Sequence, residues 1–148
     1  MLARLKTILS GAPPKNTADD LRVAVAALLV EAAWSADGFG ADERGTITRL
    51  LQDRFGISAD EAEALLEAGD KAGRNTVHML RFTKEVLHGM EHEQRVGMVE
   101  MLWDVAYADG HLDAEEERLI TKVAGLLYVS PGERSAAKRR AQARKGIA

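Results

Sequence analysis

Apolar residues recur every three or four positions along most of this chain, which is the spacing of amphipathic helices. The segment between Val23 and Val30 is apolar on nearly all sides, as is typical of a helix in the centre of a bundle. Each later segment keeps one apolar stripe. We therefore expect about seven helices, over residues 17–37, 42–55, 58–66, 76–90, 91–108, 113–127 and from 131 onward.

Local signals support several of these boundaries. A serine or aspartate followed three residues later by glutamate is a capping box, which marks the start of a helix. Three such pairs lie where we expect a helix to start, which are Ser58 with Glu61, Asp113 with Glu116, and Ser130 with Glu133. We interpret Gly69 as the beginning of the break after the third helix. The last helix has mostly alanines for an apolar face, so we expect it to dock weakly.

One motif occurs twice, each time between two amphipathic segments. Ala-Asp-Gly at 36–38 is followed by Glu43, and Ala-Asp-Gly at 108–110 is followed by Glu115. A single shift of 72 residues superimposes the two copies without a gap. Such duplication predicts an internal helix-turn-helix repeat with pseudo-two-fold symmetry, in which the two acidic turns occupy equivalent positions.

Composition indicates an all-α, single-domain bundle. Alanine and leucine supply much of the 46% apolar content, and 148 residues suit one domain. We assign residues 1–16 to a short N-terminal helix and linker, and residues 17–148 to a helical domain with a basic C-terminal tail. Cations interrupt the apolar run of the first nine residues, which therefore fit neither a signal peptide nor a membrane span. The absence of cysteine excludes disulfides and thiolate chemistry.

The acidic turns are the candidate binding sites. Carboxylates held across a sharp turn suit Ca²⁺ or Mg²⁺, and the candidate ligands are Asp37, Glu43, Asp109, Asp113 and Glu115. The spacing is not that of an EF-hand, because glycine directly follows the first aspartate of each copy. The competing interpretation is structural: aspartate and glycine make each turn, while Glu43 and Glu115 interact with free backbone N–H groups at the next helix start. The second turn is the better candidate of the two.

Two further patterns have both a functional and a structural interpretation. From Lys138 to Lys145 the tail carries five cations and no acid, which could tether the chain to an anionic membrane or to nucleic acid. We favour a solvated last helix, because no aromatic residue among these cations offers a stacking platform. His88 and His92 match a metalloprotease string, but a helix end at Gly89 would place the two imidazoles on different elements. We interpret that match as accidental.

Several stretches resemble one known family. They are Leu-Leu-Val-Glu at 28–31, Ala-Asp-Gly at 36–38, Leu-Arg-Phe-Thr at 80–83, and above all Leu-Trp-Asp-Val-Ala-Tyr-Ala-Asp-Gly at 102–110. In these stretches the chain closely resembles the TerB-like family, which is associated with tellurite resistance. The resemblance implies an all-helical bacterial domain of two similar halves with an acidic, metal-binding surface. It also implies a cytoplasmic protein, which could lie peripheral to the inner membrane and act in stress-response complexes.

We therefore expect a non-enzymatic binding or scaffold module of the TerB-like family with a role in the stress response. It would have protein partners, no catalytic residue and no small-molecule substrate, and its acidic turns would take a divalent cation as the one cofactor. The alternatives are a small metal-dependent hydrolase that uses the same carboxylates, and a membrane or nucleic-acid tether that uses the basic tail.

Overall fold

The computed structural model describes residues 18–34, 39–72 and 76–147. The expected helix at the N-terminus and the Ala-Asp-Gly motif at 36–38 lie outside these ranges. Within them the chain forms no strand and seven helices, which confirms the all-α fold. The helices are α2 (Ala18–Ala33), α3 (Ala41–Phe55), α4 (Ala59–Lys71), α5 (Thr76–Gly89), α6 (His92–Ala106), α7 (Ala114–Leu126) and α8 (Pro131–Arg144). None of these seven is both long and apolar enough to span a membrane.

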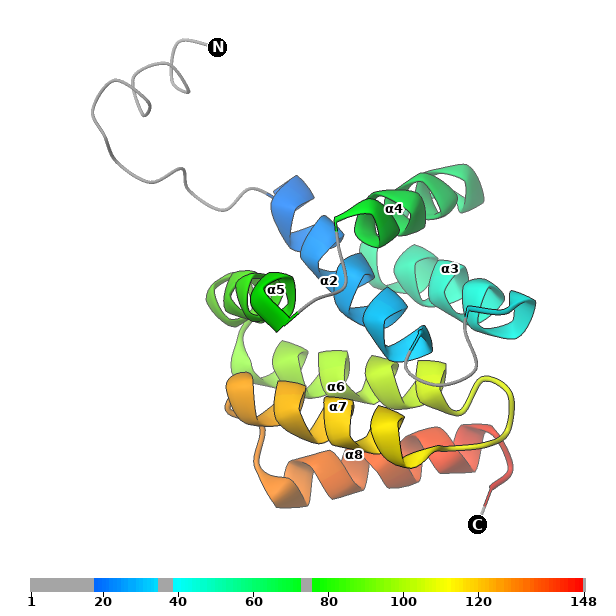
Figure 1. Cartoon of the computed structure of the whole chain (residues 1–148), viewed down its shortest axis with the longest axis vertical. Helices are drawn as coiled ribbons and strands as arrows, with labels where there is room; N and C mark the ends of the chain where they lie inside the picture. Colours follow the sequence, from blue (N-terminus) through cyan, green and yellow to red (C-terminus); the bar gives the residue numbers. More distant parts are fainter. Residues whose placement is uncertain (1–17, 35–38, 73–75, 148) are drawn as a thin grey trace, which may run out of the picture.

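Helix α2 is the centre of the bundle, as its all-round apolar sequence predicts. Nine of its 16 residues are buried. In Figure 1, α2 lies between the α3–α4 pair on the right and α5 on the left, and α6, α7 and α8 lie together below it. Helix α2 packs against each of α3, α4, α5, α6 and α7. These five helices are therefore positioned by their contact with α2, whereas α8 packs on α6.

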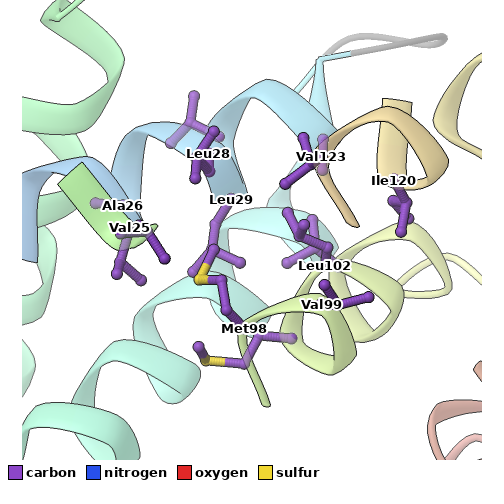
Figure 2. Close-up of a cluster of buried hydrophobic side chains, with 14 of the residues drawn as sticks. Val25, Ala26, Leu28, Leu29, Met98, Val99, Leu102, Ile120 and Val123 are labelled. Carbon is purple, nitrogen blue, oxygen red and sulfur yellow. The ribbon is translucent and has the colours of Figure 1, made fainter. Parts of the chain in front are cut away.

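The core forms where α2, α6 and α7 meet, and Figure 2 shows their side chains in one cluster. Eight of the side chains labelled in Figure 2 are at most 1% exposed and come from these three helices. Helix α2 contributes Val25, Leu28 and Leu29, α6 contributes Met98, Val99 and Leu102, and α7 contributes Ile120 and Val123. Burial of one such side chain is worth about 1.5–3 kcal/mol, so this contact fixes α6, and the turn that follows it, against the bundle.

The three predicted capping boxes are confirmed. In α4 the backbone N–H of Glu61 donates to the Ser58 hydroxyl at 3.1 Å, and in α8 that of Glu133 donates to the Ser130 hydroxyl at the same distance. Asp113 caps α7 in the same way. Because each bond joins residues three apart, the sequence alone was enough to predict these helix starts.

Gly69 corrects the interpretation of a helix break at that position. It lies inside α4 and is buried. A Cβ atom on Gly69 would stand 2.7 Å from the backbone nitrogen of Ala27 and 2.8 Å from the carbonyl carbon of Ala26, both in α2. The glycine is therefore required by the close approach of α4 to α2, and the helix continues through it to Lys71.

The expectation that the last helix docks weakly is wrong. Helix α8 packs on α6, and both Ala137 and Ala141 are completely buried. The Lys138 ammonium lies 5.2 Å from the centre of the Trp103 ring. Alanine side chains are short, so they let the two helices approach closely, and the cations beside them make ion pairs with α6. Close packing and charge replace the large apolar side chains that α8 lacks.

One helix start agrees with the 72-residue shift, while the other bounds of the two copies differ by one or two residues. The shift carries the first residue of α4, Ala59, onto Pro131, the first residue of α8. Helix α4 packs on α2, and α8 packs on α6, which is the helix at the corresponding position of the second copy. The overlay of the two halves in space stays a prediction.

Candidate functional site

The second acidic turn follows directly from the buried end of α6. Tyr107 and Ala108 are still buried, and Asp109 is the first exposed residue. Gly110 has a φ of +86°, a conformation that glycine adopts without strain. The Asp109 carboxylate accepts a hydrogen bond of 2.9 Å from the backbone N–H of His111. This local bond closes the turn and fixes the direction of the Asp109 side chain.

The start of α7 holds a reciprocal pair of carboxylates. The backbone N–H of Glu116 donates to Asp113 Oδ1 at 2.8 Å, and the backbone N–H of Asp113 donates to Glu116 Oε1 at 3.4 Å. Burial, followed by the neighbouring carboxylates of Asp113 and Asp109, raises the pKa of Glu116 from 4.5 to about 8. Glu116 is therefore mostly protonated at neutral pH.

We call Asp109, Asp113, Glu115 and Glu116 the acidic corner. Asp109 and Glu115 are exposed, whereas Asp113 and Glu116 are partly buried. Two of the predicted metal ligands have structural roles here: Asp109 closes the turn, as the structural interpretation proposed, and Asp113 caps α7, as its capping box predicted. In the part of the chain that the structure describes, no three or more histidine, aspartate or glutamate side chains are grouped closely enough to hold a metal ion. A cation site here stays a prediction.

The first acidic turn is described only from Phe39 onward, so Asp37 lies outside the described residues. Glu43 occupies the third position of α3, and Gly40 is the N-cap residue of this helix. The Glu43 carboxylate lies close to Gly40, because its Oε2 would be 2.9 Å from a Cβ atom added to that glycine. Glu43 thus has the same place on its helix as Glu116 has on α7. The 72-residue shift pairs Glu43 with Glu115 instead, because α7 starts one residue later in its copy than α3 does.

A second polar cluster, which the sequence did not reveal, joins α6 to α8. The Arg144 guanidinium donates to both carboxylate oxygens of Asp104, at 2.9 and 3.0 Å, and lies 2.6 Å from Glu100 Oε2. Arg140 pairs with the other oxygen of Glu100. Asp104 is only 8% exposed, and this burial raises its pKa, while the hydrogen bonds from Arg144 act in the opposite direction.

This cluster borders a cavity of about 310 Å³ between three helices. The lining residues are Leu50, Asp53 and Arg54 of α3, Gly97, Glu100, Met101 and Asp104 of α6, and Arg144 of α8. The signal for the cluster was present in the sequence as acids four residues apart on one predicted helix and cations four apart on another. The sequence does not show that α8 lies on α6, so it gave no reason to pair these acids with these cations.

The end of α8 also supports the helix that leads into the acidic corner. Lys145 Nζ donates to the backbone carbonyl of Ala108 at 3.1 Å, and Gln142 donates to the Tyr107 hydroxyl at 3.0 Å. Farther up α8, Lys138 lies 3.6 Å from Glu117 of α7. Four of the five cations of the basic tail, Lys138, Arg140, Arg144 and Lys145, thus make contacts inside the fold. A membrane or nucleic acid would have to compete with these contacts.

His88 and His92 lie on different helices, which confirms the predicted interruption. Helix α5 ends at Gly89, and His92 is the first residue of α6. The His92 ring nitrogen Nε2 lies 2.7 Å from Glu133 Oε2. The backbone N–H of Ser130, together with this imidazole, lowers the pKa of Glu133 to about 2. His92 therefore connects the start of α6 to the start of α8.

Comparison with known families places these features in context. Residues 22–139 match the family model described as Tellurite resistance protein TerB. The matched range begins in α2, contains the acidic corner and ends in α8. No curated protein and no solved structure matches the chain significantly. Since the family model covers most of the 148 residues, the chain belongs to the TerB family.

Proposed function

We propose that this protein is a non-enzymatic binding module that serves the tellurite-related stress response after which its family is named. Its binding surface is the acidic corner, which takes a divalent cation, Ca²⁺ or Mg²⁺, and presents it or the bare carboxylates to a protein partner. The observation that carries the proposal is the position of this corner: exposed carboxylates follow directly from the most buried part of α6.

The surrounding contacts support a preformed surface. Asp109 is held by His111, and Asp113 is held by the capping box of α7. The carbonyl of Ala108 and the hydroxyl of Tyr107 are held by the end of α8. Groups that are already ordered lose little conformational entropy when a ligand binds. Carboxylate oxygens are the ligands that Ca²⁺ and Mg²⁺ prefer, and Glu115 is exposed and free to turn toward a bound ion.

Calorimetric titration of the full chain with Ca²⁺ and with Mg²⁺ tests the cation. We expect binding at millimolar concentration or below, and a loss of at least tenfold in affinity when Asp109→Asn and Glu115→Gln are combined. Glu93→Gln is the matched control, because Glu93 is an exposed acid on α6 outside the corner. Absence of heat with either ion, or an equal loss in the control, would contradict the cation site.

The binding role is separated from the hydrolase alternative by the same samples. A metal-dependent hydrolase would cleave an activated phosphate or carboxylate ester when the cation is present and would lose this activity in the double variant. We expect no turnover above the metal-only background. Metal-dependent turnover that disappears in the double variant would contradict the binding module and favour the hydrolase.

A further inference from the structure

A row of three polar side chains joins the end of α5 to the starts of α6 and α8, which lie near one another at the left of Figure 1. The three are Arg95 and His92 of α6 and Glu133 of α8, and we call them the histidine bridge. His92 is the first residue of α6, and Arg95 follows three positions later, so both lie on one side of the helix. The acidic corner follows the opposite end of α6, so the bridge is a separate feature of the fold.

Arg95 holds the end of α5. Its Nη1 donates to the backbone carbonyls of Met90 at 3.1 Å and of Leu87 at 3.3 Å. The last carbonyls of a helix lack partners within it, so a cation placed there satisfies them and complements the negative end of the helix dipole. Met90 is only 5% exposed. The guanidinium therefore fixes α5 at the point where its last residues enter the core.

The contacts of His92 determine which of its ring nitrogens carries the proton. Arg95 Nη2 lies 3.4 Å from His92 Nδ1, and a guanidinium can only donate, so Nδ1 must be the unprotonated acceptor. The proton is then on Nε2, which donates to Glu133 Oε2 at 2.7 Å. Within the described chain, Arg95 from its own helix and Glu133 from α8 are the charged groups that contact this ring. The arrangement therefore fits a neutral imidazole with its proton on Nε2.

We propose that the histidine bridge is a pH-sensitive joint, in which protonation of His92 displaces Arg95 and loosens the end of α5. The added proton goes to Nδ1, where it places an N–H group and a positive charge against the Arg95 guanidinium. These two donors cannot bond to each other, and their like charges repel.

Arg95 is the group that moves, because protonation strengthens the other side of the bridge. An imidazolium donates to a carboxylate more strongly than a neutral ring does. Glu133 stays ionised where histidine titrates, since the Ser130 backbone N–H and the imidazole lower its pKa to about 2. Arg95 Nε is buried and makes no hydrogen bond within the described chain, so it adds nothing that holds the guanidinium in place. Acid therefore weakens the contact of Arg95 with the carbonyls of α5 and keeps the contact between α6 and α8.

Nitrogen NMR of the full chain tests the neutral state of the bridge. Correlation of the two ring nitrogens of His92 with the ring carbon-bound protons at pH 8 shows which nitrogen carries hydrogen. We expect hydrogen on Nε2 and a bare Nδ1. Hydrogen on Nδ1 at this pH would overturn the proposal, because Arg95 could not then donate to the ring.

Amide hydrogen exchange of the full chain tests the joint. Protection factors, corrected for intrinsic exchange, are compared at pH 5 and pH 7, a range in which histidine ordinarily titrates. We expect protection of residues 87–90 to be at least about threefold lower at pH 5, beyond any change at residues 99–102 in the middle of α6, which report global unfolding. Equal protection at the two pH values, or an equal change in both groups of amides, would overturn the proposal.

Three variants assign the effect to the bridge, and circular dichroism checks that each keeps its helices. His92→Gln cannot gain a charge and should remove the pH dependence at residues 87–90. Arg95→Gln should lower protection there at pH 7 to the level of the natural protein at pH 5. His88→Gln is the matched control, because His88 is an exposed histidine in the last turn of α5, and it should keep the pH dependence. A pH dependence that persists in His92→Gln, or that disappears in His88→Gln, would overturn the proposal.

Discussion

Glu116 shows how burial changes the charge of the acidic corner. Its carboxyl lies at the start of α7, where a helix dipole favours negative charge, yet burial and the carboxylates of Asp113 and Asp109 raise its pKa to about 8. The folded protein therefore holds a proton on Glu116 that the unfolded chain releases near pH 4.5. The contribution of Glu116 to folding stability must fall as the pH rises between these two values, and that contribution is constant below the lower one.

The variant Glu116→Gln removes this pH dependence, because glutamine stays neutral and its oxygen can still accept from the Asp113 backbone. Water screens part of the penalty at this partly exposed site, so we expect a gain of about 1 kcal/mol at pH 9. At pH 4 we expect no difference from the natural protein. Urea unfolding at both pH values measures this. A gain of equal size at pH 4 would show that charge is not the cause.

Arg144 neutralises a carboxylate that is almost out of contact with water. Replacing it with alanine leaves Asp104, which is 8% exposed, without its bidentate partner. We expect Arg144→Ala to destabilise the fold by about 2 kcal/mol, less than a fully buried pair would cost because the arginine itself is partly exposed. Arg139→Ala, an exposed position on the same helix, is the control and should cost under about 0.5 kcal/mol. Equal losses in urea unfolding would contradict a specific role for Arg144.

For single residues, the sequence predicted interactions between neighbours in the chain but not those between residues far apart in it. Asp113 and Glu116 were readable as a capping box because three residues separate them. The pair of Asp104 with Arg144 spans 40 residues, and the pattern of each helix alone does not say which helices touch. The pKa of Glu116 depends on burial, which has no local signature.

The packing of whole helices depends on where small residues allow close approach. Gly69 brings α4 against the backbone of α2, and buried Ala137 and Ala141 bring α8 against α6. By sequence alone a glycine within a helical pattern indicates a break, and an alanine face indicates weak docking. Both interpretations were wrong, because small residues also allow two helices to pack closely against each other.

The variant Gly69→Ala tests this view of α4. Alanine is the better helix former by about 1 kcal/mol, but its Cβ would stand 2.7 Å from the Ala27 nitrogen, and backbone cannot move aside as a flexible side chain can. We expect a net loss of at least about 2 kcal/mol. Gly125→Ala, where the new Cβ meets open space inside α7, should be neutral or stabilising. Stabilisation by both variants in denaturant unfolding would show that α4 does not approach α2 so closely.

For the whole molecule, the basic tail is part of the bundle. Its end contacts Asp104, Tyr107 and Ala108, which lead into the acidic corner. The tether alternative treats residues 138–148 as an appendage, whereas the contacts make them a support for the candidate site. The sequence could predict the α-helical class and the centre of the bundle, because apolar periodicity reports burial. The sequence could not predict that α8 contacts α6, because the charged residues of α8 alone have the pattern of a solvent-exposed helix face.

Deletion of residues 138–148 distinguishes the two roles. We expect the melting temperature to fall by at least about 5 °C, because the deletion removes the buried Ala141 and the partner of Asp104. Thermal unfolding followed by circular dichroism measures this. An unchanged melting temperature, accompanied by loss of binding to anionic vesicles or DNA at low salt, would favour the tether.

The central functional claim is that the acidic corner is the binding surface, and amide NMR of the full chain during titration with Ca²⁺ or Mg²⁺ tests it most directly. We predict saturable shift changes centred on residues 109–117, with the tail from Lys138 to Lys145 changing only where it contacts Tyr107 and Ala108. No change at millimolar cation, or changes confined to residues outside the corner, would contradict the claim.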